Sequence, residues 1–345
     1  MGEIARVAGR VLLIGFDGSR LEDATRDAVR ALGPAGAILF RRNLDDAEVL
    51  PRLMDDLSGV LPPPYLLAID QEGGRVSRLE PWIGPTPSAA AIASLGEDAA
   101  TRYGAATGRA LRALGFNVDF APVADLSEAD ARNGIGDRSF GTDPRRVAAL
   151  AGAFLAGLQS AGVAGCLKHF PGLGRTDVDS HREMPTCPLG RDRIESEDLV
   201  PFRELAAAAA IVMVGHGRYP ALDPAPRPAS LSPRIVGGLL RRRLRYRGLV
   251  ATDDLEMGAT RPRDDRGSAA VAAVRAGCDL ALYCRDLDRA AAARDALASE
   301  AERDPDFARR LAEAAAAVER TASRWKASLP DLAAFDAARR EIRAS

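Results

Sequence analysis

The segment that organises this chain is residues 163–181, VAGCLKHFPGLGRTDVDSH. Its first five residues are apolar, which predicts a short buried strand. One proline and two glycines follow at positions 171, 172 and 174, and such residues interrupt strands and helices. We therefore expect the strand to end at Lys168-His169 and to lead into a mobile loop. Two of the three histidines and one of the only two lysines in the chain lie in this segment.

The end of the same segment has the residue pattern of an acid/base device. Asp179 and His181 are two positions apart, so in an extended segment they project to the same side. A carboxylate placed there can hold an imidazole in one tautomer. An ordinary turn with side-chain to backbone hydrogen bonds would explain either residue alone, but it explains the whole set less well.

Composition narrows the class of protein. The 345 residues are 47% hydrophobic and 28% charged, and the net charge of −1 provides no global field for nucleic acid or an anionic membrane. The four cysteines show no CxxC spacing and are expected to be reduced core thiols. No apolar stretch approaches ~20 residues, and no secretory signal pattern is present. We expect a cytoplasmic monomer or weak homo-oligomer without a membrane or nucleic-acid partner.

The hydrophobic pattern predicts eight short strands that alternate with helices. Strands are expected at residues 11–16, 37–40, 65–69, 118–123, 163–167, 211–214, 249–252 and 280–283, and helices at 21–32, 45–57 and 97–114. Eight parallel βα units close a barrel, so the predicted fold is a single α/β barrel of the (β/α)8 TIM type. A doubly wound sheet is the alternative, but residues 15–18 (GFDG) match its phosphate turn poorly.

The predicted domain organisation is one catalytic domain over residues 1–345. The barrel core is expected over 11–288, and 289–345, rich in Ala, Arg and Glu, are expected to form closing helices outside the barrel, frayed after Pro330. Polar residues follow the strands where barrels of this class keep their active sites. They are Asp17, Asn43, Asp70, Asp125, Lys168, His169, His216 and Asp253.

Three further blocks place charged residues at that rim. In residues 69–79, IDQEGGRVSRL, a Gly-Gly turn lets the chain double back and bring Asp70 and Arg78 together. Residues 135–140, IGDRSF, place Arg138 in the loop after the fourth strand. Residues 248–257, GLVATDDLEM, end the seventh strand with Asp253 and Asp254. Because side chains alternate along a strand, only one of these two is expected to face the barrel interior, with the other contacting backbone.

Together these motifs resemble family 3 glycoside hydrolases of the bacterial β-N-acetylhexosaminidase type. The resemblance implies that Asp253 is the nucleophile, His181 the general acid/base and Asp179 the residue that orients His181. It also implies five residues that bind the terminal sugar, namely Asp70, Arg78, Arg138, Lys168 and His169. Leu173 departs from the His that is usual in the family, which leaves loop packing and leaving-group preference open. His216 is interpreted as rim structure that supports the site.

The function that the resemblance implies is retaining exo-cleavage of terminal β-linked N-acetylglucosamine, with muropeptide fragments as the expected source and a covalent glycosyl-enzyme as intermediate. An imidazole has an unperturbed pKa near ~6.5, so it can protonate the leaving oxygen and later deprotonate water. The partner is a small carbohydrate, and neither a metal nor an organic cofactor is expected.

Several alternatives stay open. One is a family 3 β-glucosidase, although relatives of that kind generally carry their acid on an additional domain. Another is a β-N-acetylglucosaminide phosphorylase, because a neutral histidine does not repel an incoming anion. A third is a metal-dependent barrel hydrolase built from His169, His181, His216 and Asp253. The last is a catalytically silent sugar-binding protein.

Overall fold

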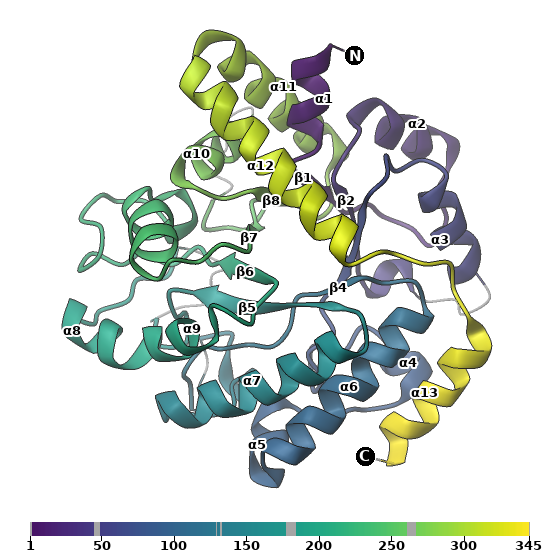
Figure 1. The fold of residues 1–345 in the computed structure, drawn as a ribbon, viewed down its shortest axis with the longest axis vertical. Coiled ribbons are helices and arrows are strands. Elements are labelled where there is room, and N and C mark those ends of the chain that lie inside the picture. The colour runs from purple at the N-terminus through teal and green to yellow at the C-terminus, as the bar shows by residue number, and fades with distance from the viewer. Residues whose placement is uncertain are drawn as a thin grey trace.

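Eight parallel strands pair in sequence order and close a barrel, because β8 also pairs with β1 (Figure 1). The computed structural model describes residues 2–44, 49–128, 130–131, 133–176, 184–260 and 267–344. The strands are β1 (Leu12–Ile14), β2 (Gly36–Leu39), β3 (Leu66–Ile69), β4 (Val118–Asp119), β5 (Ala164–Phe170), β6 (Ile211–Val214), β7 (Leu249–Asp254) and β8 (Leu280–Tyr283). The predicted (β/α)8 barrel is confirmed.

Helices connect successive strands, as parallel pairing requires. In chain order they are α1 (Glu3–Gly9), α2 (Asp23–Leu32), η1 (Arg41–Asn43), α3 (Leu50–Ser58), α4 (Glu80–Ile83), α5 (Ala89–Leu95), α6 (Glu97–Ala113), η2 (Gly136–Arg138), α7 (Pro144–Ser160), α8 (Arg191–Arg193), η3 (Ile194–Asp198), α9 (Leu199–Leu205), η4 (Ala229–Leu231), η5 (Arg234–Arg243), α10 (Ser268–Ala276), α11 (Leu287–Arg303), α12 (Pro305–Arg324) and α13 (Leu332–Ala344). None of the helices in the described ranges is long and apolar enough to cross a bilayer.

The core has an inner and an outer layer. Along β1, Leu13 belongs to the cluster inside the barrel, whereas Leu12 and Ile14 belong to the cluster between the strands and the helices. The same alternation recurs on other strands, because successive side chains of a strand point to opposite faces. Both faces of the sheet are therefore buried, which explains why the strands read as continuous apolar runs.

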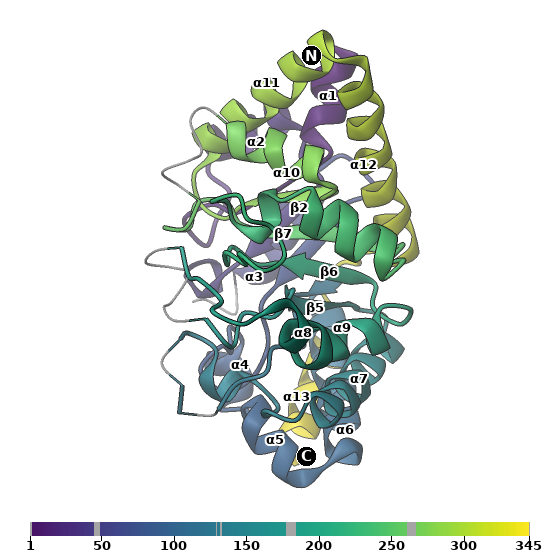
Figure 2. The same cartoon turned by 90° about the vertical axis from the view of Figure 1, so that its left-hand side faces the viewer.

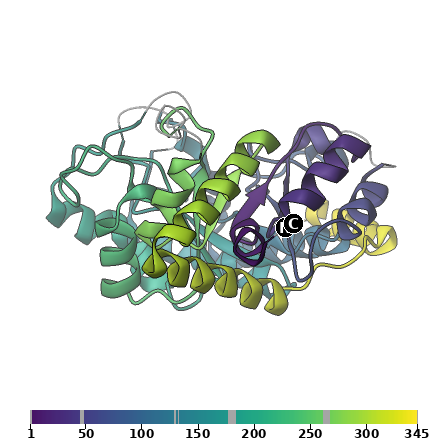
Figure 3. The same cartoon turned by 90° about the horizontal axis from the view of Figure 1, so that it is seen from above.

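Helix α12 closes the N-terminal end of the barrel. It lies across the strands in Figure 1 and along one edge of the molecule in Figures 2 and 3. The side chain of Asp304 caps its first turn by accepting hydrogen bonds from the backbone of Asp306 and Phe307. Val318 and Ala322 join the cluster inside the barrel. The active-site rim can therefore lie only at the opposite end.

Several predicted boundaries were wrong. Strand β4 ends at Asp119 rather than at residue 123, because the following segment contains Pro122, which has no N–H for the ladder. Strand β5 continues to Phe170, which pairs with Val214 of β6 after a shift in register. The chain is helical again after Pro330, where fraying was expected, because α13 packs against α6 and α4.

Candidate active site

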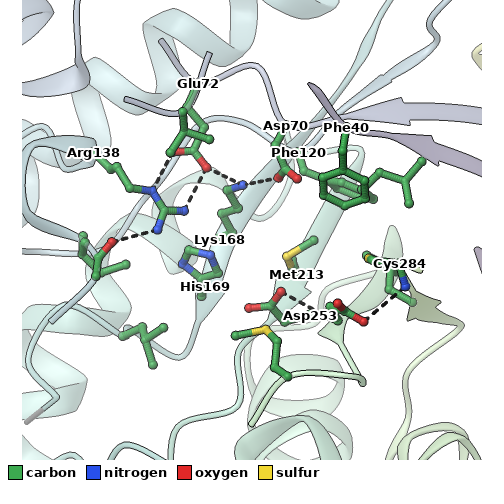
Figure 4. A pocket seen from close by; sticks show the side chains of 18 of the residues that line it. Phe40, Asp70, Glu72, Phe120, Arg138, Lys168, His169, Met213, Asp253 and Cys284 are labelled. Carbon is green, nitrogen blue, oxygen red and sulfur yellow. Dashed lines mark hydrogen bonds and ion pairs between the residues drawn. The ribbon is translucent and has the colours of Figure 1, made fainter. Parts of the chain in front are cut away.

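A cavity of about 310 Å³ opens at the C-terminal end of the barrel (Figure 4). Its wall is built from the ends of seven strands, β2 to β8, and the residues that follow them. They include Ile38, Asp70, Phe120, Lys168, Met213, Asp253 and Leu282. A volume of this size lies within the range of small-molecule sites. The cavity is the place where the barrel assembles charged residues from distant parts of the chain.

Four charged side chains form a buried network on one side of the cavity. The Lys168 Nζ atom lies 2.7 Å from Asp70 Oδ1 and 2.6 Å from Glu72 Oε1. Arg138 makes a bidentate pair with Glu72, with Nε–Oε2 and Nη2–Oε1 distances of 2.7 and 2.9 Å. Figure 4 shows the Lys168 ammonium between the two carboxylates. The pairing keeps four charges aimed at one small volume.

The network sets the protonation states of its members. Burial alone would raise the pKa of Glu72, but the charges of Arg138 and Lys168 outweigh it and hold that pKa far below its usual range. Burial alone would lower the pKa of Lys168, but Asp70 and Glu72 outweigh it and raise that pKa. Glu72 and Lys168 are therefore charged near neutral pH, and charged groups make strong hydrogen bonds to hydroxyl groups.

The turn that carries Asp70 and Glu72 depends on two glycines. Gly73 and Gly74 have positive φ angles of 93° and 54°, and a Cβ atom on Gly73 would lie 2.4 Å from the Pro87 carbonyl oxygen. The turn brings Val76 back to bond with Glu72 and Gly73. Residues 70–78 thus form a tight loop that returns Arg78 to the cavity, as the sequence predicted.

Arg78 lies on the same side of the cavity with less ion pairing than Arg138. Its Nη2 atom is 3.9 Å from Asp70 Oδ2, and its guanidinium carbon is 5.6 Å from the centre of the Phe40 ring. Its buried Nε atom has no hydrogen-bond partner among the residues that the structure describes. Arg78 therefore retains donor capacity for a ligand.

Asp125 fixes His169 in one tautomer. The His169 Nδ1 atom lies 2.7 Å from Asp125 Oδ2, so Nδ1 carries the proton that it donates to the carboxylate. The same carboxylate accepts hydrogen bonds from the backbone N–H groups of His169 and Leu173. Asp125 is inaccessible to solvent. It orients the imidazole so that Nε2 is the atom left for a ligand.

Strand β7 brings two carboxyl groups to the opposite side of the cavity. Asp253 and Asp254 both line it, so the expectation that only one would face the interior was wrong. The cause is a register shift between Ala251 and Asp254 where β7 pairs with β8, because such an irregularity breaks side-chain alternation. As predicted, Asp254 also contacts backbone, accepting from the N–H groups of Glu256 and Cys284. Burial and the nearby Glu256 and Asp253 raise the Asp254 pKa to about 7.

His216 supports the end of β7 from behind. Its Nε2 atom lies 2.9 Å from the Asp254 carbonyl oxygen, and its Nδ1 atom lies 2.8 Å from Ser230 Oγ. A carbonyl only accepts, so Nε2 carries the proton and Nδ1 accepts from the serine hydroxyl. Burial lowers the pKa of His216, which favours this neutral form.

Comparison with known proteins assigns the family. Residues 3–314 match the glycosyl hydrolase family 3 N-terminal domain. A β-hexosaminidase from Alkalilimnicola ehrlichii is 39% identical to the chain over 281 residues, covering 79% of this chain and 80% of the relative. The chain belongs to glycoside hydrolase family 3.

Solved structures of family 3 enzymes agree with this assignment. A β-N-acetylglucosaminidase from Paenibacillus sp. matches with a TM-score of 0.87 and 36% identity, covering 95% of this chain and 64% of that one. A β-N-acetylhexosaminidase from Beutenbergia cavernae matches with a TM-score of 0.80 and 31% identity, covering 94% and 99% of the two chains. The predicted glycoside hydrolase class is confirmed.

This family 3 enzyme brings most of its predicted site residues into one cavity. The residues that line it are Asp70, Arg78, Arg138, Lys168, His169 and Asp253. Asp179 and His181 lie outside the described residues, so their roles stay predictions. Asp17 and Asn43, also expected at the rim, do not line the cavity. Asp17 pairs with Arg42 and Arg285, and Asn43 donates to the Phe16 and Gly18 carbonyls.

Sequence reasoning assigned no role to Glu72. The spacing could have indicated a role in the site, because Glu72 lies two positions after Asp70 and an extended segment projects such residues to the same side. Its two cationic partners could not be inferred from spacing, because Lys168 and Arg138 lie on other strands and loops. Two nitrogen atoms of the Arg138 guanidinium bind Glu72, so the predicted contact with the sugar must use its remaining N–H groups.

Leu173 fills an apolar corner of the cavity wall. It clusters with Val123 and Ile135, and a Cβ atom on Gly217 would lie 3.1 Å from its Cδ1 atom.

The four cysteines are free and buried, as expected. Within the described ranges, no group of three or more His, Cys, Asp or Glu residues has the arrangement of a metal site.

Proposed function

We propose that this enzyme is a retaining exo-β-N-acetylglucosaminidase that releases terminal β-linked N-acetylglucosamine from muropeptide fragments. The observation that carries the proposal is the position of the Asp70–Lys168–Glu72–Arg138 network across one cavity from Asp253 (Figure 4). The network offers charged donors and acceptors to the hydroxyls of a single pyranose. Asp253 offers a carboxylate to the anomeric carbon. The similarity to a β-hexosaminidase and to a β-N-acetylglucosaminidase supports the N-acetylhexosamine class.

In the proposed first step, a carboxylate oxygen of Asp253 attacks the anomeric carbon. The bond between that carbon and the glycosidic oxygen breaks, and the oxygen takes a proton from His181, which Asp179 orients. In the second step His181 takes a proton from water, the water oxygen attacks the anomeric carbon, and the ester to Asp253 breaks. The sugar leaves with its original configuration, and both groups return to their starting states.

The cavity also contains surface suited to an acetamido group. Its wall also includes the apolar side chains of Ile135, Leu173 and Met257. A methyl group gains about 1 kcal/mol or less from such burial, so this wall favours an acetamido substituent only modestly over a hydroxyl. Residues 1–345 are proposed to act as one catalytic domain, and the cytoplasmic location stays a prediction.

A panel of chromogenic β-glycosides that differ only at the 2-position tests the substrate. Turnover of the N-acetyl compound with little turnover of the hydroxyl compound is expected, and the reverse preference would support a β-glucosidase.

Asp253→Ala should lower kcat by roughly 1,000-fold or more, as removal of a nucleophile does, and retained activity would overturn the assignment. Proton NMR of the first-formed anomer tests retention.

A comparison of products with and without phosphate tests hydrolysis against phosphorolysis. The proposal expects free N-acetylglucosamine at the same rate in both buffers. Formation of the sugar 1-phosphate would instead support the phosphorylase. The carboxylate of Asp253, the proposed nucleophile, favours water, because its negative charge opposes the approach of phosphate.

A further inference from the structure

A second hollow lies near the N-terminal end of the barrel, on the face that α12 crosses. Its volume is about 850 Å³. Three segments form most of its wall, namely the end of α9 with residues 206–210, the segment from Leu244 to Leu249, and the C-terminal part of α12 with Trp325. Gln159 of α7 completes the wall. Helix α12 crosses the end of the barrel opposite the catalytic rim (Figures 1 and 2). The lining residues of the hollow and of the proposed sugar site have no member in common, so the two are separate.

Five arginines from these three segments line the hollow, and no acidic residue does. They are Arg203, Arg245, Arg247, Arg320 and Arg324. Among the described residues, none of the five makes an ion pair. Arg203 donates to the Glu195 carbonyl oxygen, and the Arg324 guanidinium lies 5.7 Å from the centre of the Trp325 ring. All five side chains are exposed to solvent.

Two arginines outside the hollow are neutralised by carboxylates. Arg243 pairs with Glu195, and Arg275 pairs with Glu300 and Asp304. The chain as a whole carries a net charge of −1, so a general excess of positive charge does not explain the cluster. The fold has gathered five positive charges around one concavity and placed no carboxylate among them.

Such an arrangement attracts a compact anion of high charge. Guanidinium groups repel one another at short range, and a bound anion removes that cost. The planar fork of arginine matches the oxygens of a phosphate group better than a lysine ammonium does. The hollow has the volume of a small-molecule site, whereas a nucleic-acid backbone requires an extended groove.

The hollow also has fixed, partly apolar walls. The amide of Gln159 donates to the Ala208 carbonyl and accepts from the Ala210 N–H, which holds residues 206–210 in place. Trp325 is partly buried, and its backbone carbonyl accepts from the buried side chain of Asn117. Preformed walls lower the entropy cost of binding a small ligand.

We propose that this hollow binds a small phosphorylated anion, with the five arginines as its ligands. The class is a molecule that carries a diphosphate or two neighbouring phosphate groups. Such binding is independent of the glycosidase chemistry proposed for the opposite end of the barrel. Failure of one proposal would therefore leave the other standing.

Calorimetric titration of the full chain with inorganic pyrophosphate at fixed ionic strength tests the proposal. The double variant Arg247→Glu/Arg320→Glu should weaken binding by about tenfold or more. The control Arg102→Glu/Arg145→Glu makes the same change in charge at exposed positions of α6 and α7. It should change binding by less than about twofold. Circular dichroism of each variant verifies that it is folded.

Two outcomes would overturn the proposal. One is the absence of measurable binding of pyrophosphate to the wild-type protein. The other is an equal loss of affinity in both double variants, which would show a general charge effect. Sedimentation with phosphatidylglycerol vesicles tests whether the phosphate belongs to a lipid headgroup or to a soluble molecule. Binding to vesicles without binding to free pyrophosphate would count against a small soluble ligand.

Discussion

The Nζ atom of Lys168 lies 2.6 Å from Oε1 of Glu72 in a wall of the active site where both side chains are almost inaccessible to solvent. Glu72 also binds Arg138 in a bidentate pair. One carboxylate thus positions two of the cations that are predicted to bind the sugar. Removal of such a partner leaves buried charge without compensation, which is far more costly than removal of both charges.

Glu72→Gln should therefore reduce both stability and substrate binding. We expect a loss of about 3 kcal/mol in the free energy of unfolding and a rise in KM of about tenfold or more, because Arg138 and Lys168 lose their anchor. Urea denaturation and steady-state kinetics measure the two effects. Asp137→Asn is the control, because it removes the more exposed pair with Arg75 and should cost less than about 1 kcal/mol. Equal losses in the two variants would contradict the role of the network.

His216→Ala should lower kcat with little effect on KM. His216 donates to the Asp254 carbonyl and so holds the end of the strand that carries Asp253. We expect a fall of about tenfold, because small displacements of a nucleophile are costly. The pH profile should keep its shape, because burial lowers the pKa of His216 and keeps it neutral. Ser230→Ala should have a smaller effect. A shifted acidic limb in His216→Ala would show that the residue titrates in the reaction.

Because of Asp198, we expect the free energy of unfolding to fall as the pH rises. Its side chain is buried, and neither carboxylate oxygen has a hydrogen-bond partner in the described part of the chain. Burial raises the pKa of Asp198 to about 7. Between the unfolded value near ~4 and pH ~7 the folded state binds more protons than the unfolded state, so stability falls across that window.

Asp198→Asn should remove this pH dependence. At pH 8 the variant should be more stable than the wild type by roughly 1–3 kcal/mol, whereas at pH 4 the two should be nearly equal. Thermal unfolding at both pH values measures the difference. The neighbouring Glu197→Gln is the control, because Arg193 holds the pKa of Glu197 low and its removal should not stabilise the protein. An equal effect of Asp198→Asn at both pH values would rule out the proton linkage.

Leu173→His should destabilise the protein, although the resemblance to family 3 hexosaminidases leads us to expect His at this position. In this chain Leu173 packs with Val123 and Ile135 in an apolar corner. A buried imidazole without partners costs roughly 1–3 kcal/mol. Leu173→Met, which keeps the volume and the polarity, should cost less than about 1.5 kcal/mol. Thermal melts of the two variants compare them, and a fully stable Leu173→His protein would show that the corner can accept a polar ring.

Removal of divalent metal should leave the activity unchanged. Both ring nitrogens of His216 are engaged by Ser230 and Asp254, and Nδ1 of His169 is engaged by Asp125. A metal site built on His216 would have to break one of those bonds. Dialysis against EDTA followed by the chromogenic assay measures the effect. Loss of activity that zinc restores would favour the metal-dependent hydrolase.

The strand positions were largely predictable because burial on both faces of a parallel barrel leaves a local signal. Strands β6 and β8 begin and end where the apolar runs at 211–214 and 280–283 predicted. The ends of β4, β5 and β7 were predicted wrongly because apolar runs do not by themselves fix where a strand ends. Proline, register shifts and pairing with a neighbouring strand decide where a strand ends, and only the first of these is visible in the sequence.

The sequence by itself determined the eightfold strand and helix rhythm, and it placed Asp70, Lys168, His169 and Asp253 at strand ends that share one rim. The tertiary structure alone decided which charges neutralise one another. Glu72 binds cations from two remote segments, while the five arginines at the other end of the barrel have no acidic neighbour in their hollow. The physical reason is that hydrophobic periodicity is a property of adjacent residues, whereas Coulomb interactions depend on distances in space that the closed barrel sets.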